Sequence, residues 1–285
     1  MIVVTGANGN LGRKIVEELL ERVPSEEIGV SVRDTNKAQD LQERGVRVRQ
    51  GNFEDSESLL HAFEQASQVL IVSSNALEGE EAVRQHQTAI DMAKKAGVGR
   101  VLYTSHMGSS ATSYFPHAHQ CGYRRDSEIF GDGFHIASMR LFCQFSVIDD
   151  QRCLENRGIH RPGKRSDCLD YSLGPGAVTA VILTEGKLDG ITPPLTASEA
   201  IDMEGIASIA SKILDRPIRH IVVSDEEYRK RLTSHGMPEA IVNLLTGIFQ
   251  ASRQGDFSQI DPALENLIGR PPIHFQDFLK ESIPQ

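Results

Sequence analysis

Glycines recur at every third position of the stretch TGANGNLG, residues 5–12, and this spacing is typical of a loop that binds phosphate groups. The apolar run at residues 2–4 is typical of a buried parallel strand, and Leu11, Ile15 and Leu19 indicate a helix after it. Between the two, the first glycine permits a tight turn, the second lets the backbone approach a pyrophosphate, and the third lets helix and strand pack closely. Free amides at the helix start then face the phosphates. We expect a dinucleotide to be bound by Gly6, Ala7, Asn8, Gly9, Asn10, Leu11 and Gly12.

The residues after the second expected strand, at 28–32, bear on which dinucleotide binds. This strand ends at Arg33 and Asp34, and Lys37 follows four residues after Arg33. An acidic residue at this position binds the ribose 2′-hydroxyl of NAD, whereas an arginine forms paired hydrogen bonds to the 2′-phosphate of NADP. A charge-assisted bond of this kind contributes about 1.5–3 kcal/mol, or about ten- to a hundredfold in preference. We favour NADP (NADPH), because Arg33 suits a 2′-phosphate. NAD is the alternative, because Asp34 could bind the ribose instead of turning outward.

Polar residues also follow or end three further expected strands. Asn52 comes after the third strand and is positioned to hydrogen-bond adenine, while Phe53 is expected to pack. Small hydroxyl and amide side chains after the fourth and fifth strands suit a nicotinamide ribose and carboxamide, although such residues are also common in turns. We therefore expect further cofactor contacts at Asn52, Ser73, Ser74, Asn75 and Thr104.

Alternating patterns of strand and helix position these residues. Strands are expected at 28–32, 46–48, 69–72 and 101–104, with helices at 56–65 and 80–96. This alternation predicts an α/β fold of the Rossmann type, a doubly wound parallel sheet whose ligand lies beyond the carboxyl ends of its strands. Farther along, an apolar helix at 177–183, capping boxes at 196–199 and 224–227, and a short strand at 221–223 predict a smaller α/β C-terminal lobe.

Composition excludes several classes of partner. The 285-residue chain has a net charge of −9 and no basic run, which argues against nucleic acid. No apolar stretch approaches the ~20 residues of a membrane span, and the chain opens on a strand rather than a signal peptide, so we expect a cytoplasmic protein. The four cysteines lack C-x-x-C spacing, and His117, His119 and Cys121 have no second ligand pair, so no metal is expected. The sequence is silent on oligomeric state.

Four motifs together resemble the NmrA-like, atypical branch of the short-chain dehydrogenase family: TGANGNLG, Arg33, GNFED at 51–55 and VLYTS at 101–105. The similarity is to NAD(P)H-dependent quinone reductases and triphenylmethane-dye reductases of that branch. Residues 224–239 and 264–272 are similar to the family's substrate-side domain. The resemblance implies an NAD(P)-binding Rossmann domain at 1–115, and at 177–285 the end of that domain with a substrate lobe. It further implies hydride transfer to a quinone or dye, a small aromatic acceptor.

The chain departs from ordinary short-chain dehydrogenases in lacking a Tyr-x-x-x-Lys pair. The residues four positions after its five tyrosines are Met107, Ala118, Ser127, Pro175 and Leu232. In that pair the lysine lowers the pKa of the tyrosine, which then acts as a general acid. A quinone or cationic dye accepts hydride readily and takes protons from water, so the missing pair favours such an acceptor, or no catalysis. The alternative function is an NADP(H)-sensing, NmrA-like regulatory protein, and no catalytic residue is assigned.

Residues 116–176 form an irregular segment without sustained strand or helix periodicity, and all four cysteines fall in it. The family should show there Ala-Ala-Thr-Glu on a helix, then a sixth strand reading like Thr-Ser-Leu-Arg. Possible codons for residues 121–125, read one base later, encode Ala-Ala-Thr-Glu, and those for 134–145 encode Phe-Thr-Ser-Leu-Arg-Cys-Gly-Phe. We hypothesise that residues 117–175 are translated out of frame, with a divergent insertion as the alternative. The sixth strand and the nicotinamide wall would then be absent from the chain as written.

Overall fold

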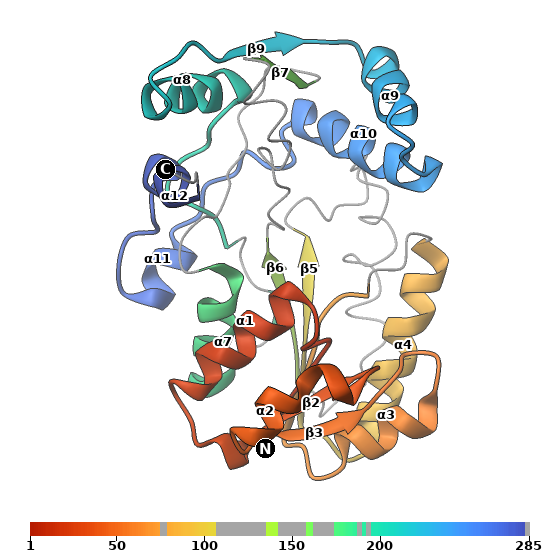
Figure 1. Ribbon diagram of the computed structural model, residues 1–285. Coiled ribbons are helices and arrows are strands. Elements are labelled where there is room, and N and C mark those ends of the chain that lie inside the picture. The colour runs from red at the N-terminus through yellow and green to blue at the C-terminus, as the bar shows by residue number, and fades with distance from the viewer. Residues whose placement is uncertain are drawn as a thin grey trace.

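A computed structural model describes residues 1–74, 79–106, 135–141, 158–161, 174–186, 190–191 and 195–282. Figure 1 shows two lobes, one built around a large sheet that begins at the N-terminus and one formed by C-terminal helices beyond the ends of β5 and β6. Within the described residues, no helix combines the length and the apolar character that crossing a membrane requires.

The sheet of the first lobe has seven parallel strands in the order β3-β2-β1-β4-β5-β6-β8. The order reverses between β1 and β4, which is the topological switch point at which doubly wound sheets bind ligands. This arrangement confirms the Rossmann-type fold expected from the sequence. The strands are β1 (Ile2–Thr5), β2 (Ile28–Val32), β3 (Arg47–Gln50), β4 (Gln68–Ile71), β5 (Arg100–His106), β6 (His135–Leu141) and β8 (Gly190–Ile191).

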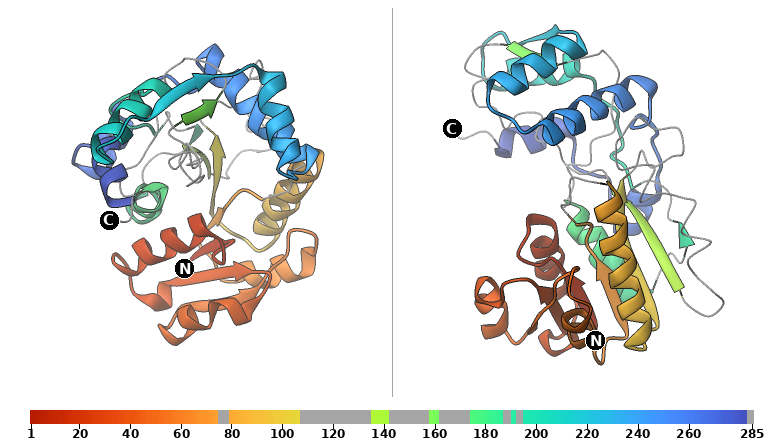
Figure 2. Two further views of the ribbon diagram at one scale, coloured as in Figure 1. Left: turned by 45° about the horizontal axis from the view of Figure 1, so that its top comes forward. Right: turned by 90° about the vertical axis from the view of Figure 1, so that its right-hand side faces the viewer.

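Alternate residues of each strand face opposite sides of the sheet, and helices cover both sides (Figure 2). Val4, Leu70 and Leu102 pack with α1 (Asn10–Leu20) and α7 (Gly174–Glu185) in one buried cluster. Val69 and Val101 pack on the other side with α3 (Ser56–Phe63) and α4 (Gly79–Lys95). The short elements η1 (Ser25–Glu27), η2 (Thr35–Ala38) and α2 (Gln39–Glu43) flank β2.

The expectation that a sixth strand is absent was wrong. Residues 135–141 form β6, which pairs in parallel with β5 from Arg100 beside His135 to His106 beside Leu141. Its irregular side-chain pattern hid it, because strand formation depends more on neighbouring strands than on intrinsic preference. Translation in another frame would change side chains rather than the path of the backbone, so it remains a separate prediction. The four cysteines, His117 and His119 lie outside the described residues.

The second lobe packs α8 (Met203–Ile213), α9 (Asp225–Ser234), α10 (Glu239–Gln254) and α12 (Phe275–Ser282) beside a two-stranded parallel sheet, β7 (Gly158–Arg161) and β9 (Arg219–Val222). Ser224 caps α9 as expected, accepting from the Glu227 amide. The cap expected at Thr196 was wrong, because α8 begins after Asp202, whose carboxylate accepts from the Gly205 amide. Helix α11 (Ala263–Ile268) returns to the first lobe and packs against α7.

Candidate functional site

The Gly-rich loop joins β1 to α1 at the switch point of the sheet. Gly6 has a φ of +66°, a left-handed conformation that strains other residues, and its amide donates to the Ser31 carbonyl at 3.0 Å. A Cβ on Gly12 would lie 2.5 Å from the Gly6 carbonyl oxygen. Gly12 therefore lets α1 pack on the backbone of the loop itself, rather than on the strand as the sequence suggested.

The start of α1 leaves backbone donors available. Gly9 is the N-cap, with extended backbone, and the Arg13 amide donates to its carbonyl at 2.9 Å. Helix geometry gives the amides of Asn10, Leu11 and Gly12 no intrahelical acceptor, so they suit an anion. A Cβ on Gly9 would lie 3.4 Å from the Gly6 carbonyl oxygen, which the fold tolerates. A glycine at this position is thus consistent with the predicted approach of a pyrophosphate.

Side chains of the loop contribute less than its backbone. Ala7 is fully buried, so it can reach a ligand only through main-chain atoms, and Leu11 is partly buried against the core. The exposed Asn8 uses its side-chain amide to donate to the Asp34 carbonyl at 2.8 Å. The loop is therefore joined directly to the end of β2.

The structure shows how the three charged residues after β2 are disposed. The Asp34 carboxylate accepts from the Asn36 amide at 3.1 Å and caps η2, so the acid is used within its own turn. Arg33 and Lys37 are exposed, and within the described part of the chain their side chains form no hydrogen bond or ion pair. Two unpaired cations beside the Gly-rich loop suit a phosphate better than a ribose hydroxyl.

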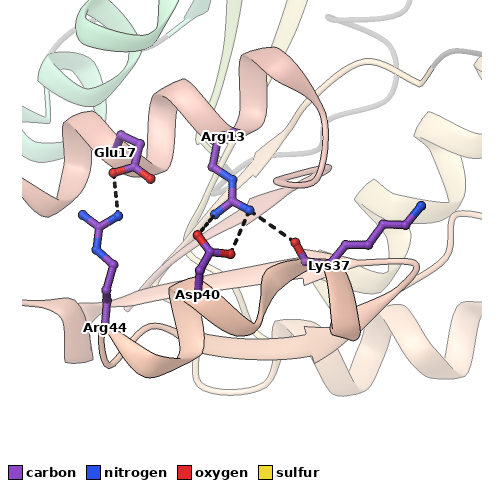
Figure 3. A network of polar contacts seen from close by, with 5 residues as sticks. All are labelled: Arg13, Glu17, Lys37, Asp40 and Arg44. Carbon is purple, nitrogen blue, oxygen red and sulfur yellow. Dashed lines mark hydrogen bonds and ion pairs between the residues drawn. The ribbon is translucent and has the colours of Figure 1, made fainter.

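Sequence reasoning missed a pair of salt bridges that join α1 to the segment after β2 (Figure 3). Arg13 binds the Asp40 carboxylate through two hydrogen bonds, and Arg44 binds Glu17 at 2.7 Å. Arg13 also donates to the Lys37 carbonyl, while the Lys37 side chain extends toward the side on which α1 begins. Arg13 and Glu17 lie about one turn apart on the expected helix, and each has its partner 27 positions later in the sequence. Nothing in the sequence indicated these partners.

Beyond β4, three successive backbone amides donate to side chains from three different elements. The Val72 amide donates to Thr5 Oγ1 at 2.9 Å and the Ser73 amide to Thr104 Oγ1 at 2.9 Å. The Ser74 amide donates to His86 Nε2 at 3.0 Å. These side chains fix the path of the chain just past the sheet, next to the switch point.

The hydroxyls predicted to contact nicotinamide thus have structural partners. Ser73 Oγ hydrogen-bonds the Thr104 carbonyl and lies 2.8 Å from Thr104 Oγ1. Thr104 is only 5% exposed. Cofactor contact by these residues stays a prediction, because the Ser73 and Thr104 hydroxyls and the Ser73 and Ser74 amides already take part in hydrogen bonds within the protein. Asn75 lies outside the described residues.

His86 of α4 is the residue at this end that the sequence did not indicate. Burial lowers its pKa from 6.5 to about 4, and acceptance from the Ser74 amide requires an unprotonated Nε2. The neutral ring meets Phe53 edge to face, with centroids 6.3 Å apart, so Phe53 packs as expected. Asn52 lies next to it, and its side-chain oxygen accepts from the Glu54 amide at 3.2 Å.

Residues 6–126 match the family described as NAD(P)H-binding. The chain is 27% identical to quinone oxidoreductase 2 of Escherichia coli, over 95% of this chain and 94% of that protein. It is 23% identical to an NmrA-like family domain-containing oxidoreductase of Aspergillus flavus, over 98% and 94%. The crystal structure of Citrobacter sp. triphenylmethane reductase complexed with NADP(H) superposes with a TM-score of 0.90, at 28% identity, over 99% and 100%. These similarities confirm the resemblance carried by the motifs.

Proposed function

Because the chain is a homologue of quinone and NmrA-like oxidoreductases and carries an NAD(P)H-binding domain, we propose that it is an NADPH-dependent reductase of quinones or aromatic dyes. One observation supports the cofactor above all: Arg33 and Lys37 are exposed and, among the described residues, unpaired beside a loop shaped for a pyrophosphate, while the Asp34 carboxylate caps a turn. The acceptor is a small aromatic molecule that contacts the second lobe.

The residues of the site divide the work of binding. The amides from Asn10 to Gly12 hold the pyrophosphate at the positive end of α1, and the two cations hold the adenosine 2′-phosphate. The main chain from Val72 to Ser74, whose amides donate to side chains of other elements, lies at the nicotinamide end and supports it. NADPH, when bound, supplies a hydride that passes directly to the acceptor.

The chemistry balances without a proton-donating side chain. A quinone gains the hydride and one proton from water to become a hydroquinone, and a cationic triarylmethane dye gains the hydride alone at its central carbon. NADPH becomes NADP⁺ in both cases. This accounts for a chain that lacks the Tyr-x-x-x-Lys pair, since neither acceptor needs a general acid held by the protein.

NADPH oxidation, followed by absorbance with benzoquinone or a triarylmethane dye as acceptor, tests the proposal. We expect one NADPH consumed per quinone reduced, without added flavin or metal, and a rate that depends on acceptor concentration. Tight NADPH binding without turnover on any of these acceptors would contradict the reductase and favour the NADP(H)-sensing regulator. A cytoplasmic site of action belongs to the same proposal, supported by cysteines without disulfide spacing.

We also propose that residues 117–175 derive from a shifted reading frame. The near-complete mutual coverage with triphenylmethane reductase, 99% of this chain and 100% of that chain, supports this reading over an inserted segment, which would have lengthened the protein. Sequencing the gene across this span is expected to reveal one change of reading frame near each end, by insertion or deletion of bases, with the second restoring the frame that the first displaced. An unbroken frame would overturn the idea. The restored chain should reduce quinones faster than the chain as written.

A further inference from the structure

The turn that carries Lys37 is tied at both ends to the element that carries the Gly-rich loop. At its start, the Asp34 carbonyl accepts from the Asn8 side chain at 2.8 Å. At its end, the Lys37 carbonyl accepts from Arg13 Nη2 at 3.3 Å. Asn8 belongs to the loop and Arg13 to the first turns of α1. These two ties therefore set the spacing between the expected pyrophosphate site and the expected 2′-phosphate site.

Asp40 fixes the arginine that makes the second tie. Its two carboxylate oxygens accept from Arg13 Nη1 and Nη2 at 2.7 and 3.1 Å, the fork geometry that restricts a guanidinium most strongly. The hydrogen bond from Arg13 lowers the pKa of Asp40, so the carboxylate is charged near neutral pH. Because Asp40 is 59% exposed, the pair adds little to stability, and its effect is chiefly on geometry.

A second ion pair joins the same elements without contacting the turn. Glu17 lies one helical turn after Arg13 on α1, and it accepts from Arg44 Nη1 at 2.7 Å (Figure 3). The chain thus contains two exposed Arg–carboxylate pairs between the same two elements, of which only one reaches a main-chain atom of Lys37. This second pair is a matched control for the first.

We propose that Arg13 is a positioning residue for NADPH, which holds the backbone of Lys37 so that the Lys37 and Arg33 cations reach the adenosine 2′-phosphate. The inference rests on the proposed cofactor and deepens it, since it names a residue that supports the preference for NADPH over NADH by positioning the cations that contact the 2′-phosphate. Asp40 takes part by holding the guanidinium and by preventing it from swinging toward solvent.

Binding of NADPH and of NADH to matched variants tests this role, with dissociation constants measured by titration of reduced-cofactor fluorescence. Arg13→Gln should weaken NADPH by about tenfold and change NADH by less than about twofold. Arg44→Gln removes the control arginine and should leave both cofactors unchanged. Thermal unfolding of each variant checks that the fold is retained.

Asp40→Asn separates positioning from simple charge. If Arg13 attracted phosphate only as a cation, loss of the neighbouring carboxylate would tighten NADPH binding. A positioning role predicts the opposite sign, weaker NADPH binding with little change for NADH, because the guanidinium loses its fork partner. Tighter NADPH binding by Asp40→Asn would overturn the inference, as would equal losses for both cofactors in Arg13→Gln.

The same titrations distinguish this inference from the reductase proposal. Wild-type protein that binds NADPH but reduces no acceptor, with Arg13→Gln and Asp40→Asn selectively weakened for NADPH, supports the positioning role while contradicting the enzyme. Wild-type protein that binds neither cofactor overturns both.

Discussion

The two ends of the proposed cofactor site, after β2 and after β4, use polar side chains in different ways. After β2 the charged residues are exposed, and Arg33 and Lys37 keep their side chains free of protein partners in the described structure. After β4 the polar residues are uncharged, and the buried Thr5 and Thr104 and the half-buried His86 accept hydrogen bonds from consecutive amides. The first end leaves charged groups available for the proposed cofactor, and the side chains of the second end hold the main chain in place.

This difference matters for reading strand ends. Burial of a polar group requires a partner, and at a strand end an adjacent backbone amide is the nearest one. The hydroxyls of Ser73 and Thr104 are therefore used in hydrogen bonds within the protein, whereas the exposed cations of Arg33 and Lys37 have no partner among the described residues. Residue type alone does not tell a side chain that is available to a ligand from one that hydrogen-bonds the main chain. Residue type together with exposure does.

The largest effect should come from Gly12, which serves both ends through the loop. In Gly12→Ala the new Cβ would meet the Gly6 carbonyl oxygen, which lies 2.5 Å from its position, so the loop backbone must shift. We expect NADPH and NADH affinity to fall together, by about tenfold or more, because the amides that hold the pyrophosphate move with the loop. Gly99→Ala, whose Cβ lies 3.6 Å from its nearest atom, should bind normally. Unchanged affinity in Gly12→Ala would contradict the assigned loop.

Low pH should destabilise the structure at the β4 end, where His86 lies, but not at the β2 end. The pKa of His86 is lowered from 6.5 to about 4 by burial, so the unfolded chain binds the proton first and stability falls as pH drops from about 6.5 to about 4. This histidine contributes about 3 kcal/mol to that fall. Urea unfolding at several pH values should show a smaller fall for His86→Gln, whose amide oxygen still accepts from Ser74. Identical pH dependence would rule out the buried neutral ring.

At the β2 end, Arg33→Ala should change the preference for NADPH over NADH rather than the free energy of unfolding. Loss of the exposed guanidinium is expected to weaken NADPH by about ten- to a hundredfold, with NADH altered far less. Lys37→Ala should act in the same direction with a smaller effect, because an ammonium binds phosphate as a point charge rather than with a fork. Dissociation constants for both cofactors provide the measurement. Equal weakening of NADH and NADPH would remove the 2′-phosphate from this position.

The smallest effect is expected from Thr104→Val, which acts on the β4 end alone. The change leaves the Ser73 amide without its acceptor and should lower the free energy of unfolding by about 1–3 kcal/mol. The ratio of NADPH to NADH affinity should not change. Thr246→Val is a matched control, because that buried hydroxyl only donates to the Val242 carbonyl in its own helix. A shifted cofactor ratio in Thr104→Val would show that its hydroxyl does more than brace the chain.

Much of the sheet lobe could be predicted because its information is local. The strand at 28–32 is uniformly β-branched or small and is buried throughout, and the turn at Gly6 is encoded by three glycines in order. The position of Arg33 at the ligand edge followed from the end of this strand, and its contact with the cofactor stays a prediction.

Other features depend on contacts that spacing does not reveal. Arg13 meets Asp40 only because α1 crosses the segment after β2, and His86 meets Ser74 only because α4 folds back along β4. Thr196 matches a capping motif, yet its hydroxyl hydrogen-bonds the backbone of Asp261 from a distant segment, which local pattern reading could not find.

Helix α11 has a consequence for how the chain is made. Leu264 is fully buried in the cluster that α1, α7 and the sheet share, although α11 follows all of these elements along the chain. During synthesis, the sheet lobe emerges from the ribosome with this part of its core still uncovered, and α11 completes it only after the second lobe has been translated. A protein truncated before α11 should therefore fail in the lobe that was translated first.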